Sequence, residues 1–485
     1  MGQTLKNVKI PYPTEGVIRS AQLNDTICPE NSVQLAVNMN FDRVGAVTTR
    51  LGVATFATTL SGAAISFGSL NVLGGNKRLF AHVGSAIYVW NGSTWTSVRS
   101  SLTGSGKARF SQFLNRTWMV NGSAGDVPKT SNGGAFDATD VPATFPKGDF
   151  IEAGYGGRVW IADATKDILY YSDIVQSVDG TTYVSPLTFS LTTNFITQFS
   201  PQDGESITGL FRVPKALLLF KQNHIYRVYS TTNVDPYPAY NVGTFSQESI
   251  VQGKDGVYFH HSSGFYKFNY DGQPTEISRR VIDFVKAIPR TSYSSIVGVY
   301  DGFDAIKWSI GAVTVDGVSY ANCQVRYTIS TQVWTIYDFG STAITALIRY
   351  DDGTTIEQIA GTSSGLVGKL DSGYTDFGAD IYYDLIDRWR SFTDMYSQVK
   401  NISGMMIMTE NGAGMELQYR TERTPENRWE DIDMVKDKYD ALFPNASTDD
   451  FNNIQLRLRG NSKGTPIIYH GTEVLSIQVK GFEEN

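Results

Sequence analysis

The chain has 485 residues, and its 41 Lys and Arg against 48 Asp and Glu give a formal net charge of -7. This acidic balance provides no overall positive field, which excludes a protein that holds nucleic acid through its global charge. With 41% hydrophobic and only 18% charged residues, the composition is that of a folded protein. The 12% aromatic content and the 46 glycines favour many short strands joined by tight turns.

The start of the chain, MGQTLKNVKIPYPTE, lacks the basic and then apolar order of a secretory signal. No window has the apolar length that a transmembrane helix needs. The two cysteines, Cys28 and Cys323, are too few for a disulfide framework in so long a chain. We therefore expect a protein that is made in a reducing compartment and does not contact a membrane.

The segment from Gln22 to Phe56 contains the run SVQLAVNMNFDRVGAVTTRLGVATFA, in which apolar and polar residues alternate on both sides of a turn at Gly45. Such alternation is typical of strands that bury one face. Because this segment precedes a series of repeats, we expect it to supply an outer strand to them or to close one of them.

The repeated unit is a short apolar run, a polar link, and a pair such as Ile-Tyr or Phe-Tyr that opens the next strand. The units recur at intervals of roughly 40 to 50 residues, which is the period of repeated sheets in propellers. Clear copies lie at Leu79–Val98, Arg158–Asp173, Ala216–Ser230 and Asp255–Gly272, and looser copies start at Arg116, Ala305 and Ile356.

A four-stranded meander has two faces to bury and two edges to protect, and packing meanders side by side around an axis does both. We therefore predict an all-β fold in which residues 1–377, including the N-terminal strands, form a β-propeller of about six or seven blades. A sandwich with long hairpins is the alternative, because degenerate repeats fit it as well.

One short helix is expected inside the repeats, at SRRVIDFVKAI, where Ser278 can cap and Ile282, Val285 and Ile288 share one face. After about Gly378 the rhythm changes to long alternating strands. We predict a C-terminal, jelly-roll-like β-sandwich over residues 378–485. A charged stretch at about 423–450 is expected to be a polar insertion that serves as an interaction loop.

The histidines do not indicate a metal site. His260 and His261 are neighbours in a predicted strand, so their side chains should point to opposite faces. The other histidines, His82, His224 and His470, lie in different units without a ligand spacing.

Candidate catalytic groups are equally sparse. Asp301, Asp304, Asp351 and Asp352 lie beside turn glycines, which is typical of turn formers rather than of a glycosidase pair. The run LTGSGKAR resembles a phosphate-binding loop but has Ala108 where that loop needs Ser or Thr. No GxSxG nucleophile motif occurs. We predict a protein that is not an enzyme and has no catalytic residue, cofactor or metal ion.

Two consecutive runs, LLLFKQNHIYRVYS and NVGTFSQESIVQGKDGVYFHHSSGFYKFNYDGQPTEISRRVIDF, carry a family resemblance. Together they resemble tail-hub or nozzle β-propeller proteins of tailed bacteriophages, which include the packaged-DNA stabilisation proteins of short-tailed phages. The earlier run VNMNFDRVGAVTTRLGV is similar to the first strands of that family. The matching positions are Ile225 and Tyr226, Val242 and Gly243, Ser249 to Val251, Gly256 to Phe259, Gly264 to Tyr266, and Ile277 and Ser278.

The resemblance implies a structural virion protein of a phage tail, made in the host bacterial cytoplasm. Such a protein forms a ring, commonly a homohexamer, below the portal and its adaptor, lines the DNA exit channel, and helps to retain and eject the genome. Its implied partners are further copies of itself, the portal, the adaptor, other tail proteins, tail fibres, and double-stranded DNA that passes without sequence-specific binding. An acidic lumen would suit that passage because it repels phosphates.

The candidate interface residues are Arg423, Trp429, Tyr439 and Phe443, because interface cores are enriched in aromatic residues and Arg. Two alternative functions stay open. One is a propeller-based glycan hydrolase with facing carboxylates in a central funnel. The other is a carbohydrate-binding tail protein that presents Trp429 and Tyr439 to a sugar.

Overall fold

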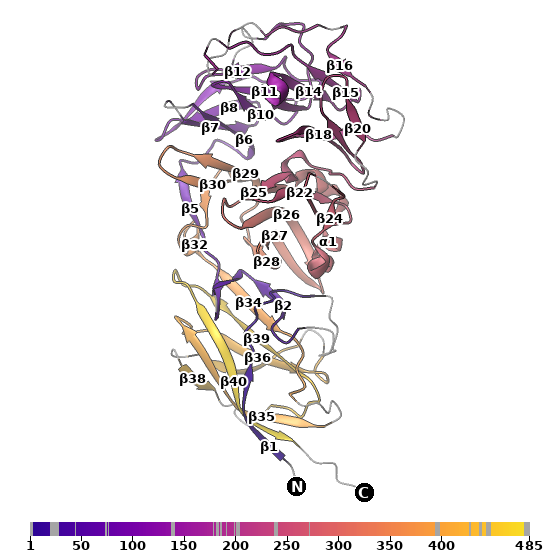
Figure 1. Ribbon diagram of the computed structural model, residues 1–485. Helices are drawn as coiled ribbons and strands as arrows, with labels where there is room; N and C mark the ends of the chain where they lie inside the picture. The colour runs from indigo at the N-terminus through magenta and orange to yellow at the C-terminus, as the bar shows by residue number, and fades with distance from the viewer. Residues whose placement is uncertain are drawn as a thin grey trace.

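The protein is elongated in its computed structural model, with a ring of small sheets at one end and a β-sandwich at the other (Figure 1). Both chain termini lie at the sandwich end. None of the helices in the described ranges is long and apolar enough to cross a membrane. The structure describes residues 3–19, 29–43, 45–72, 75, 77–136, 141–177, 179–180, 184, 187–190, 192–197, 199, 204–236, 241–270, 272–392, 398–425, 428–435, 439–442 and 448–479.

Seven consecutive antiparallel sheets form the ring within these ranges, and we number them as blades 1 to 7. Blade 1 contains β6 (Ala64–Asn71), β7 (Lys77–Val83), β8 (Ala86–Trp90) and β9 (Trp95–Arg99). Blade 2 contains β10 (Arg109–Phe113), β11 (Arg116–Val120) and β12 (Lys129–Ser131). Blade 3 contains β13 (Phe150–Ala153), β14 (Val159–Asp163), β15 (Ile168–Tyr171) and β16 (Phe195–Ile196).

The remaining blades follow in chain order. Blade 4 contains β17 (Ile207–Val213), β18 (Ala216–Lys221), β19 (Ile225–Val228) and β20 (Val234–Pro236). Blade 5 contains β21 (Val251–Gly253), β22 (Gly256–His261), β23 (Gly264–Phe268) and β24 (Thr275–Glu276). Blade 6 contains β25 (Val297–Tyr300), β26 (Ala305–Val315), β27 (Val318–Thr328) and β28 (Val333–Asp338). Blade 7 contains β29 (Ile344–Asp351), β30 (Ile356–Thr362) and β31 (Val367–Leu370), and β5 (Val53–Ala57) is its fourth strand.

The ring is closed, which confirms the predicted propeller. The first strand of each blade lies innermost, and β29 of blade 7 contacts β6 of blade 1. The N-terminal strand β5 pairs with β31, so Val53 lies opposite Leu370 and Ala57 opposite Val367. The N-terminal segment therefore supplies an outer strand and closes a blade, as the sequence predicted.

Apolar side chains from facing blades hold the ring together. Between blades 4 and 5, for example, Leu218 and Phe220 of β18 pack with Val257 and Phe259 of β22 in one buried cluster. Each of these strands is buried on both faces, because its alternate side chains meet the preceding and the following blade. This explains the continuous apolar runs ALLLF and GVYF in the sequence.

The sandwich has two sheets, and its strands come from both ends of the chain. One sheet contains β1 (Gln3–Ile10), β3 (Met39–Arg43), β4 (Ala46–Thr49), β35 (Lys400–Glu410), β38 (Tyr439–Leu442) and β40 (Ile468–Val479). The other contains β2 (Val33–Val37), β34 (Tyr382–Asp387), β36 (Glu416–Thr421), β37 (Glu430–Met434) and β39 (Ile454–Asn461). A two-stranded ribbon, β32 (Thr375–Asp376) and β33 (Ala379–Asp380), lies beside β5 at the border of the two parts.

The predicted propeller range, residues 1–377, is therefore wrong at its N-terminal end. Only β5 of the N-terminal strands belongs to the propeller, whereas β1 to β4 belong to the sandwich. The alternation of β1 to β4 fits either sheet equally well, and the sandwich partners of β1, β2 and β4 lie more than 300 residues later in the chain, so the sequence did not identify them. The propeller is an insertion into the sandwich.

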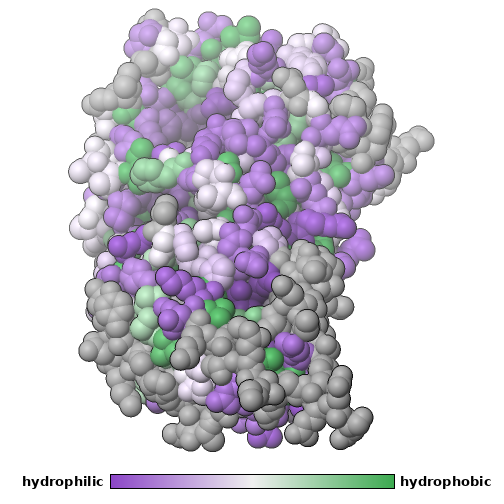
Figure 2. Space-filling model, turned by 60° about the horizontal axis from the view of Figure 1, so that its bottom comes forward, coloured by the Kyte–Doolittle hydropathy of each residue, from purple (hydrophilic) through white to green (hydrophobic). Residues whose placement is uncertain are grey.

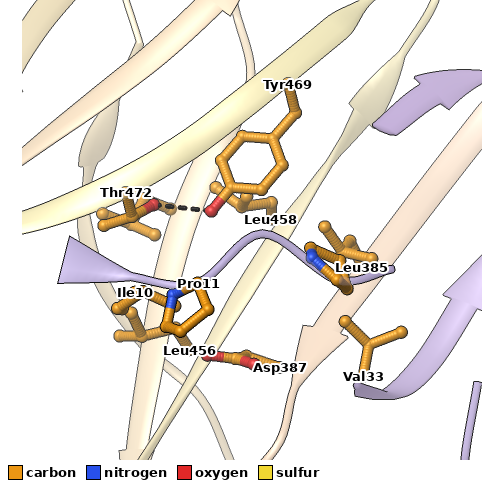
Figure 3. Close-up of a pocket in the computed structure, with 11 residues that line it drawn as sticks. Ile10, Pro11, Val33, Leu385, Asp387, Leu456, Leu458, Tyr469 and Thr472 are labelled. Atoms are coloured by element: carbon orange, nitrogen blue, oxygen red, sulfur yellow. Dashed lines mark hydrogen bonds between the residues drawn. The ribbon is translucent and has the colours of Figure 1, made fainter. Parts of the chain in front are cut away.

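The first residues also close the gap between the two sandwich sheets (Figure 3). Ile10 and Pro11 face Leu456 and Leu458 of the opposite sheet around a small apolar cavity. At its rim, the Tyr469 hydroxyl is 2.8 Å from the Thr472 hydroxyl. The close packing leaves little room for a ligand here.

The propeller and the sandwich share one sheet. Strand β2 pairs in parallel with β28 of blade 6, with Val37 opposite Ile336, and this joins the two parts in a nine-stranded sheet. Asn38 strengthens the joint, because its side chain donates to the Asp338 carbonyl oxygen at 3.1 Å and accepts from the Asp338 N–H at 3.0 Å.

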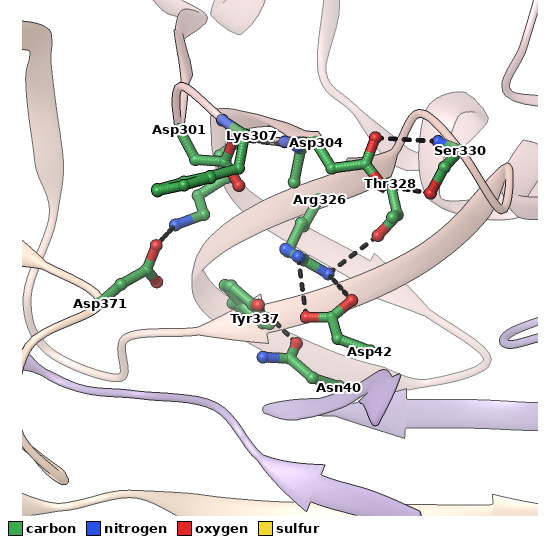
Figure 4. Close-up of polar contacts among 12 residues, drawn as sticks. Asn40, Asp42, Asp301, Asp304, Lys307, Arg326, Thr328, Ser330, Tyr337 and Asp371 are labelled. Carbon is green, nitrogen blue, oxygen red and sulfur yellow. Dashed lines mark hydrogen bonds and ion pairs between the residues drawn. The ribbon is translucent and has the colours of Figure 1, made fainter. Parts of the chain in front are cut away.

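Charged side chains also cross the joint (Figure 4). Arg326 of blade 6 binds Asp42 of the sandwich at 2.9 Å, and Tyr337 binds Asn40. Arg50 is 1% exposed, donates to Asn38 at 2.8 Å and to Asp376 at 2.8 Å, and lies 4.2 Å from the centre of the Phe339 ring. The two parts are therefore tied by polar contacts as well as by the shared sheet.

The expected helix is present as α1 (Ile282–Ala287). Ser278 does not cap it: the Ser278 hydroxyl accepts a hydrogen bond from the Phe265 N–H at 3.0 Å. The short 3-10 helices are η1 (Tyr155–Gly157), η2 (Gln247–Ser249), η3 (Arg279–Val281) and η4 (Arg290–Ser295).

Removing Arg50 tests the joint. We expect Arg50→Met to lower the free energy of unfolding by about 3 to 5 kcal/mol, because Asp376 would keep a nearly buried charge without its partner. The double variant Arg50→Met with Asp376→Leu should lose less, since it removes both charges. Chemical denaturation followed by tryptophan fluorescence measures both, and a single variant within about 1 kcal/mol of the wild type would contradict the expectation.

Candidate functional site

The charged stretch at 423–450 contains two edge strands. Strand β37 pairs with β36 at the end of the nine-stranded sheet, and β38 pairs with β35 at the edge of the other sheet. The predicted polar insertion therefore includes an edge strand of each sandwich sheet and is not a loop alone. Its charges concealed the alternation in EDIDMV, in which Ile432 is buried between exposed Asp431 and Asp433. Charged residues on edge strands discourage pairing with other sheets.

Two of the four predicted interface residues can be placed fully. The Arg423 side chain is 57% exposed, and its Nε lies 3.6 Å from Glu422. It lines a polar hollow of about 680 Å³, together with Arg428 and Glu430. Trp429 is half-buried next to this hollow. Tyr439 belongs to β38, although its side chain lies outside the described part of the chain, and Phe443 lies outside it altogether.

Trp429 is part of a row of alternating aromatic and cationic side chains, which we call the Trp–Arg ladder. Its members are Trp389, Arg420, Trp429 and Arg457. The Arg420 guanidinium lies 5.2 Å from the Trp389 ring centre and 4.8 Å from the Trp429 ring centre. Arg457 lies 5.3 Å from Trp429. Each distance is within the range of cation–π attraction.

The ladder lies on the outer face of the sandwich. Leu417 and Tyr419 of β36 are buried in the core, so Arg420 points to the opposite face of its strand. Leu456 and Leu458 place Arg457 on that same outer face. Arg457 is fixed by two hydrogen bonds to Asp384, at 2.9 and 2.6 Å.

Such a surface is suited to binding another protein. Trp and Arg are the residue types most enriched among side chains that dominate binding energy, and here they are held in place before binding. Outside the grey residues, the face shown in Figure 2 is mostly hydrophilic with separate hydrophobic patches. A contact at the ladder would depend on a few anchoring side chains. Sequence reasoning found Trp429 but missed Trp389, Arg420 and Arg457. Only the pairing of β36 with β39 brings the two arginines together.

A second charged cluster spans the propeller axis. Arg109 of blade 2 donates to Glu248 at 3.0 Å, and the Lys107 ammonium is 3.4 Å from the same carboxylate. Glu248 belongs to η2, just before blade 5, so these ion pairs cross the centre of the ring from one side to the other. Burial alone would raise the pKa of Glu248, but Arg109 and Lys107 outweigh it and lower the pKa to about 2. Side chains therefore bridge the central channel.

Glu152 of blade 3 lies in the same channel with a contrasting environment. Its carboxylate is 3.8 Å from Arg212 of blade 4 and accepts a hydrogen bond from Ser111 of blade 2 at 3.3 Å. Burial raises the pKa of Glu152 to about 7 despite both contacts. The channel therefore holds one carboxylate that is ionised and one that titrates near neutral pH.

The paired histidines are structural. His260 packs edge-on against Phe265 and Tyr293, with ring centres 5.0 and 5.1 Å away. His261 points to the other face, where its ring binds Ser263 at 2.8 Å and Asn223 at 3.2 Å. The opposite orientation confirms the prediction. Burial lowers the pKa of His260 to about 3, so this ring is neutral. In the described residues, no three His, Cys, Asp or Glu side chains are grouped to hold a metal ion.

Three of the four aspartates, Asp301, Asp351 and Asp352, form turns as predicted. The fourth, Asp304, instead binds Lys254 and accepts a hydrogen bond from the Ser330 N–H at 3.1 Å. The Asp301 carboxylate accepts hydrogen bonds from the N–H groups of Phe303, Asp304 and Ala305 at 2.8 to 3.0 Å. Asp352 accepts from the N–H groups of Thr354 and Thr355 in the same way. These carboxylates are committed to the backbone.

Comparison with known proteins gives similarity at the level of overall architecture. No family model and no curated protein matches the chain. Virginiamycin B lyase from Staphylococcus aureus is similar over 66% of this chain and 98% of its own, at 14% identity and a TM-score of 0.43. YCF48 from Cyanidioschyzon merolae is similar over 66% and 98% of the two chains, at 10% identity and a TM-score of 0.39.

The extracellular domain of a one-component system from B. thetaiotaomicron is similar over 93% of this chain and 63% of its own, at 11% identity and a TM-score of 0.43. At these values the similarities carry no argument about function. The fold itself rests on the strand pairing.

The titration of Glu152 has a measurable effect on stability. Between pH 4.5 and about 7 the unfolded chain has released the Glu152 proton while the folded protein still holds it, so stability falls across this range and levels off above it. We expect Glu152→Gln to abolish this loss and to be more stable than the wild type by about 1 to 3 kcal/mol at pH 8. At pH 4 the difference should vanish.

Denaturation curves between pH 4 and pH 8 measure this difference. Glu473→Gln makes the same change on the sandwich and serves as the control. Parallel curves for the wild type and Glu152→Gln would contradict the assignment.

Proposed function

We propose that the protein is a structural component of a bacteriophage tail. It acts by assembly in a ring below the portal and adaptor, where it lines the DNA exit channel and helps to retain and eject the genome. The observation that carries this proposal is the Trp–Arg ladder, a preorganised binding surface on the outer face of the sandwich. The overall layout, a propeller combined with a sandwich, agrees with the family resemblance of residues 216–284.

DNA would pass between copies of the chain and not through the propeller. Ion pairs from Arg109 and Lys107 to Glu248 cross the propeller axis. A duplex whose major groove alone is about 12 Å wide does not fit through an axis that side chains bridge. The channel of the proposed ring is therefore an opening that several copies surround.

The ladder is the proposed contact with a neighbouring copy or an adjoining tail protein. Arg420 and Arg457 are already ordered by Trp389, Trp429 and Asp384, so a partner would not have to immobilise flexible side chains. The chain carries a net charge of -7, so a cationic and aromatic surface can bind an acidic surface of the next copy. The expected assembly is a homohexamer in the virion tail.

A glycan hydrolase is the second candidate, and the contrast between Glu152 and Glu248 favours it. A carboxyl with a pKa of about 7 can serve as a general acid beside a carboxylate that stays ionised. Both groups, however, already bind cations in the channel. Release of reducing sugar from host glycans by the wild type, and its loss in Glu152→Gln, would favour this candidate over the structural one.

The assembly proposal is tested with the purified protein and a ladder variant. We expect the wild type to form rings of several copies in electron micrographs and in native mass spectrometry. Trp429→Ala should weaken the contact roughly 30-fold, because truncating a central aromatic anchor costs about 2 kcal/mol or more. Ile174→Ala, which removes an exposed side chain from the propeller, is the control. A stable monomeric wild type that also fails to join portal-containing particles would contradict the proposal.

A further inference from the structure

An exposed aromatic side chain projects from blade 6. Phe303 lies in the turn between β25 and β26 and is 84% exposed, more than any other large apolar side chain in the described part of the chain. Three N–H groups bind the Asp301 carboxylate, and Gly302 has a φ of +89°, which favours glycine. The turn is therefore rigid. We call Asp301, Gly302, Phe303 and Asp304 the knob.

A pocket of matching character opens between blades 4 and 5. Its volume is about 310 Å³, at the lower end of the range for small-ligand sites. Two cationic residues, Lys215 and Arg227, belong to its lining. The other lining residues are apolar or aromatic: Val213, Pro214, Ala216, Leu218, Tyr229, Phe268 and Tyr270.

Contacts within the protein hold the cationic and aromatic side chains of the pocket in place. The Arg227 guanidinium lies 5.5 Å from the Tyr229 ring centre and donates to the Tyr270 carbonyl oxygen at 3.4 Å. Tyr270 receives a further hydrogen bond from Gln252. Lys215 is exposed at the tip of the β17–β18 turn, and no other described residue forms an ion pair with it. An anionic group would therefore find a cation at the pocket.

The knob and the pocket lie on the same face of the ring. Successive strands of a blade run in opposite directions. The turn between the first and second strands of a blade therefore lies on the same face of the ring as the end of its third strand. The knob is such a turn in blade 6. The pocket combines such a turn in blade 4 with the ends of the third strands β19 and β23. Both features therefore point in one direction.

We propose that this pocket binds Phe303 of a second copy of the chain, so that two propellers pair face to face. Because knob and pocket point the same way, the two copies must be related by a rotation of about 180°, and each knob then enters the other copy's pocket. Asp301 flanks Phe303 and would lie near Lys215, whereas Asp304 is already paired with Lys254. The aromatic side chain fills the apolar space, and the Asp301 carboxylate, which has hydrogen bonds but no ion pair among the described residues, complements the exposed Lys215.

This contact goes beyond the proposed tail ring, because it uses the propeller face and not the sandwich. The number of copies distinguishes the two ideas. Face-to-face pairing doubles the mass of the particle: two single chains pair if the sandwich contact forms no ring, and two rings pair if it does. A failure of the ring would leave pairs of chains, whereas a failure of the pairing would leave single rings.

The experiment compares masses by sedimentation velocity at about 10 µM. We expect the wild type to have twice the mass of Phe303→Ala, and Lys215→Glu to weaken pairing about tenfold. Val318→Ala removes an exposed apolar side chain from the β26–β27 turn at the opposite end of blade 6, and it should keep the wild-type mass. Circular dichroism checks that each variant is folded.

A peptide provides a second measurement. The capped peptide YDGFDA, which copies residues 300–305, should bind the Phe303→Ala protein and should dissociate wild-type pairs, and the same peptide with Ala in place of Phe should do neither. Equal masses for the wild type and Phe303→Ala would overturn the proposal whether or not the peptide binds. Peptide binding with equal masses would instead show that a segment of another protein, with the same chemistry, fills the pocket.

Discussion

The closure of the ring by β5 is the constraint on which the rest of the structure depends. Val367 pairs with Ala57, which lies more than 300 residues earlier in the chain. Without β5, blade 7 would expose a strand edge, and the buried cluster between blades 1 and 7 would lose Ala57. The channel, the pocket between blades 4 and 5 and the face that carries Phe303 all require the closed ring. A contact so distant in sequence forms slowly, because a long loop must close first.

The sandwich depends on the same N-terminal segment. Strands β1, β2 and β4 pair with strands that follow the propeller, so the ring is built between the two halves of one sandwich. The parallel pairing of β2 with β28 then joins both parts in a single sheet. Arg50 illustrates the consequence. The nearly complete burial of its guanidinium group is tolerated because Asn38 and Asp376 accept its hydrogen bonds from both sides of the joint.

The sequence was most informative where structure is local. The alternation in ALLLFKQNHIYRV and GVYFHHSSGFYKF predicted the hairpins of blades 4 and 5, and the opposite orientation of His260 and His261 followed from it. The assignment of β1 to β4 failed because β1, β2 and β4 have their sandwich partners far along the chain. The charges of EDIDMV hid the edge strand β37, since an exposed edge strand needs few apolar residues.

The functional surfaces could be predicted only in part. Trp429 was identified from its residue type and its place in a charged stretch. Its neighbours Arg420 and Arg457 come from two strands whose register no single sequence specifies. The ion pairs across the propeller axis likewise could not be predicted from the sequence, because Arg109 and Glu248 are 139 positions apart. The knob at Phe303 stood beside aspartates that the sequence identified correctly as turn formers, but its exposure became visible only in the fold.

The position of the two termini has a mechanical consequence. Gln3 at the start of β1 lies opposite Val479 at the end of β40, so the two ends leave the sandwich side by side. A force that pulls them apart would peel β1 from β40 one hydrogen bond at a time, which is the weakest way to load a pair of strands. The blades would carry no tension until the sandwich had opened.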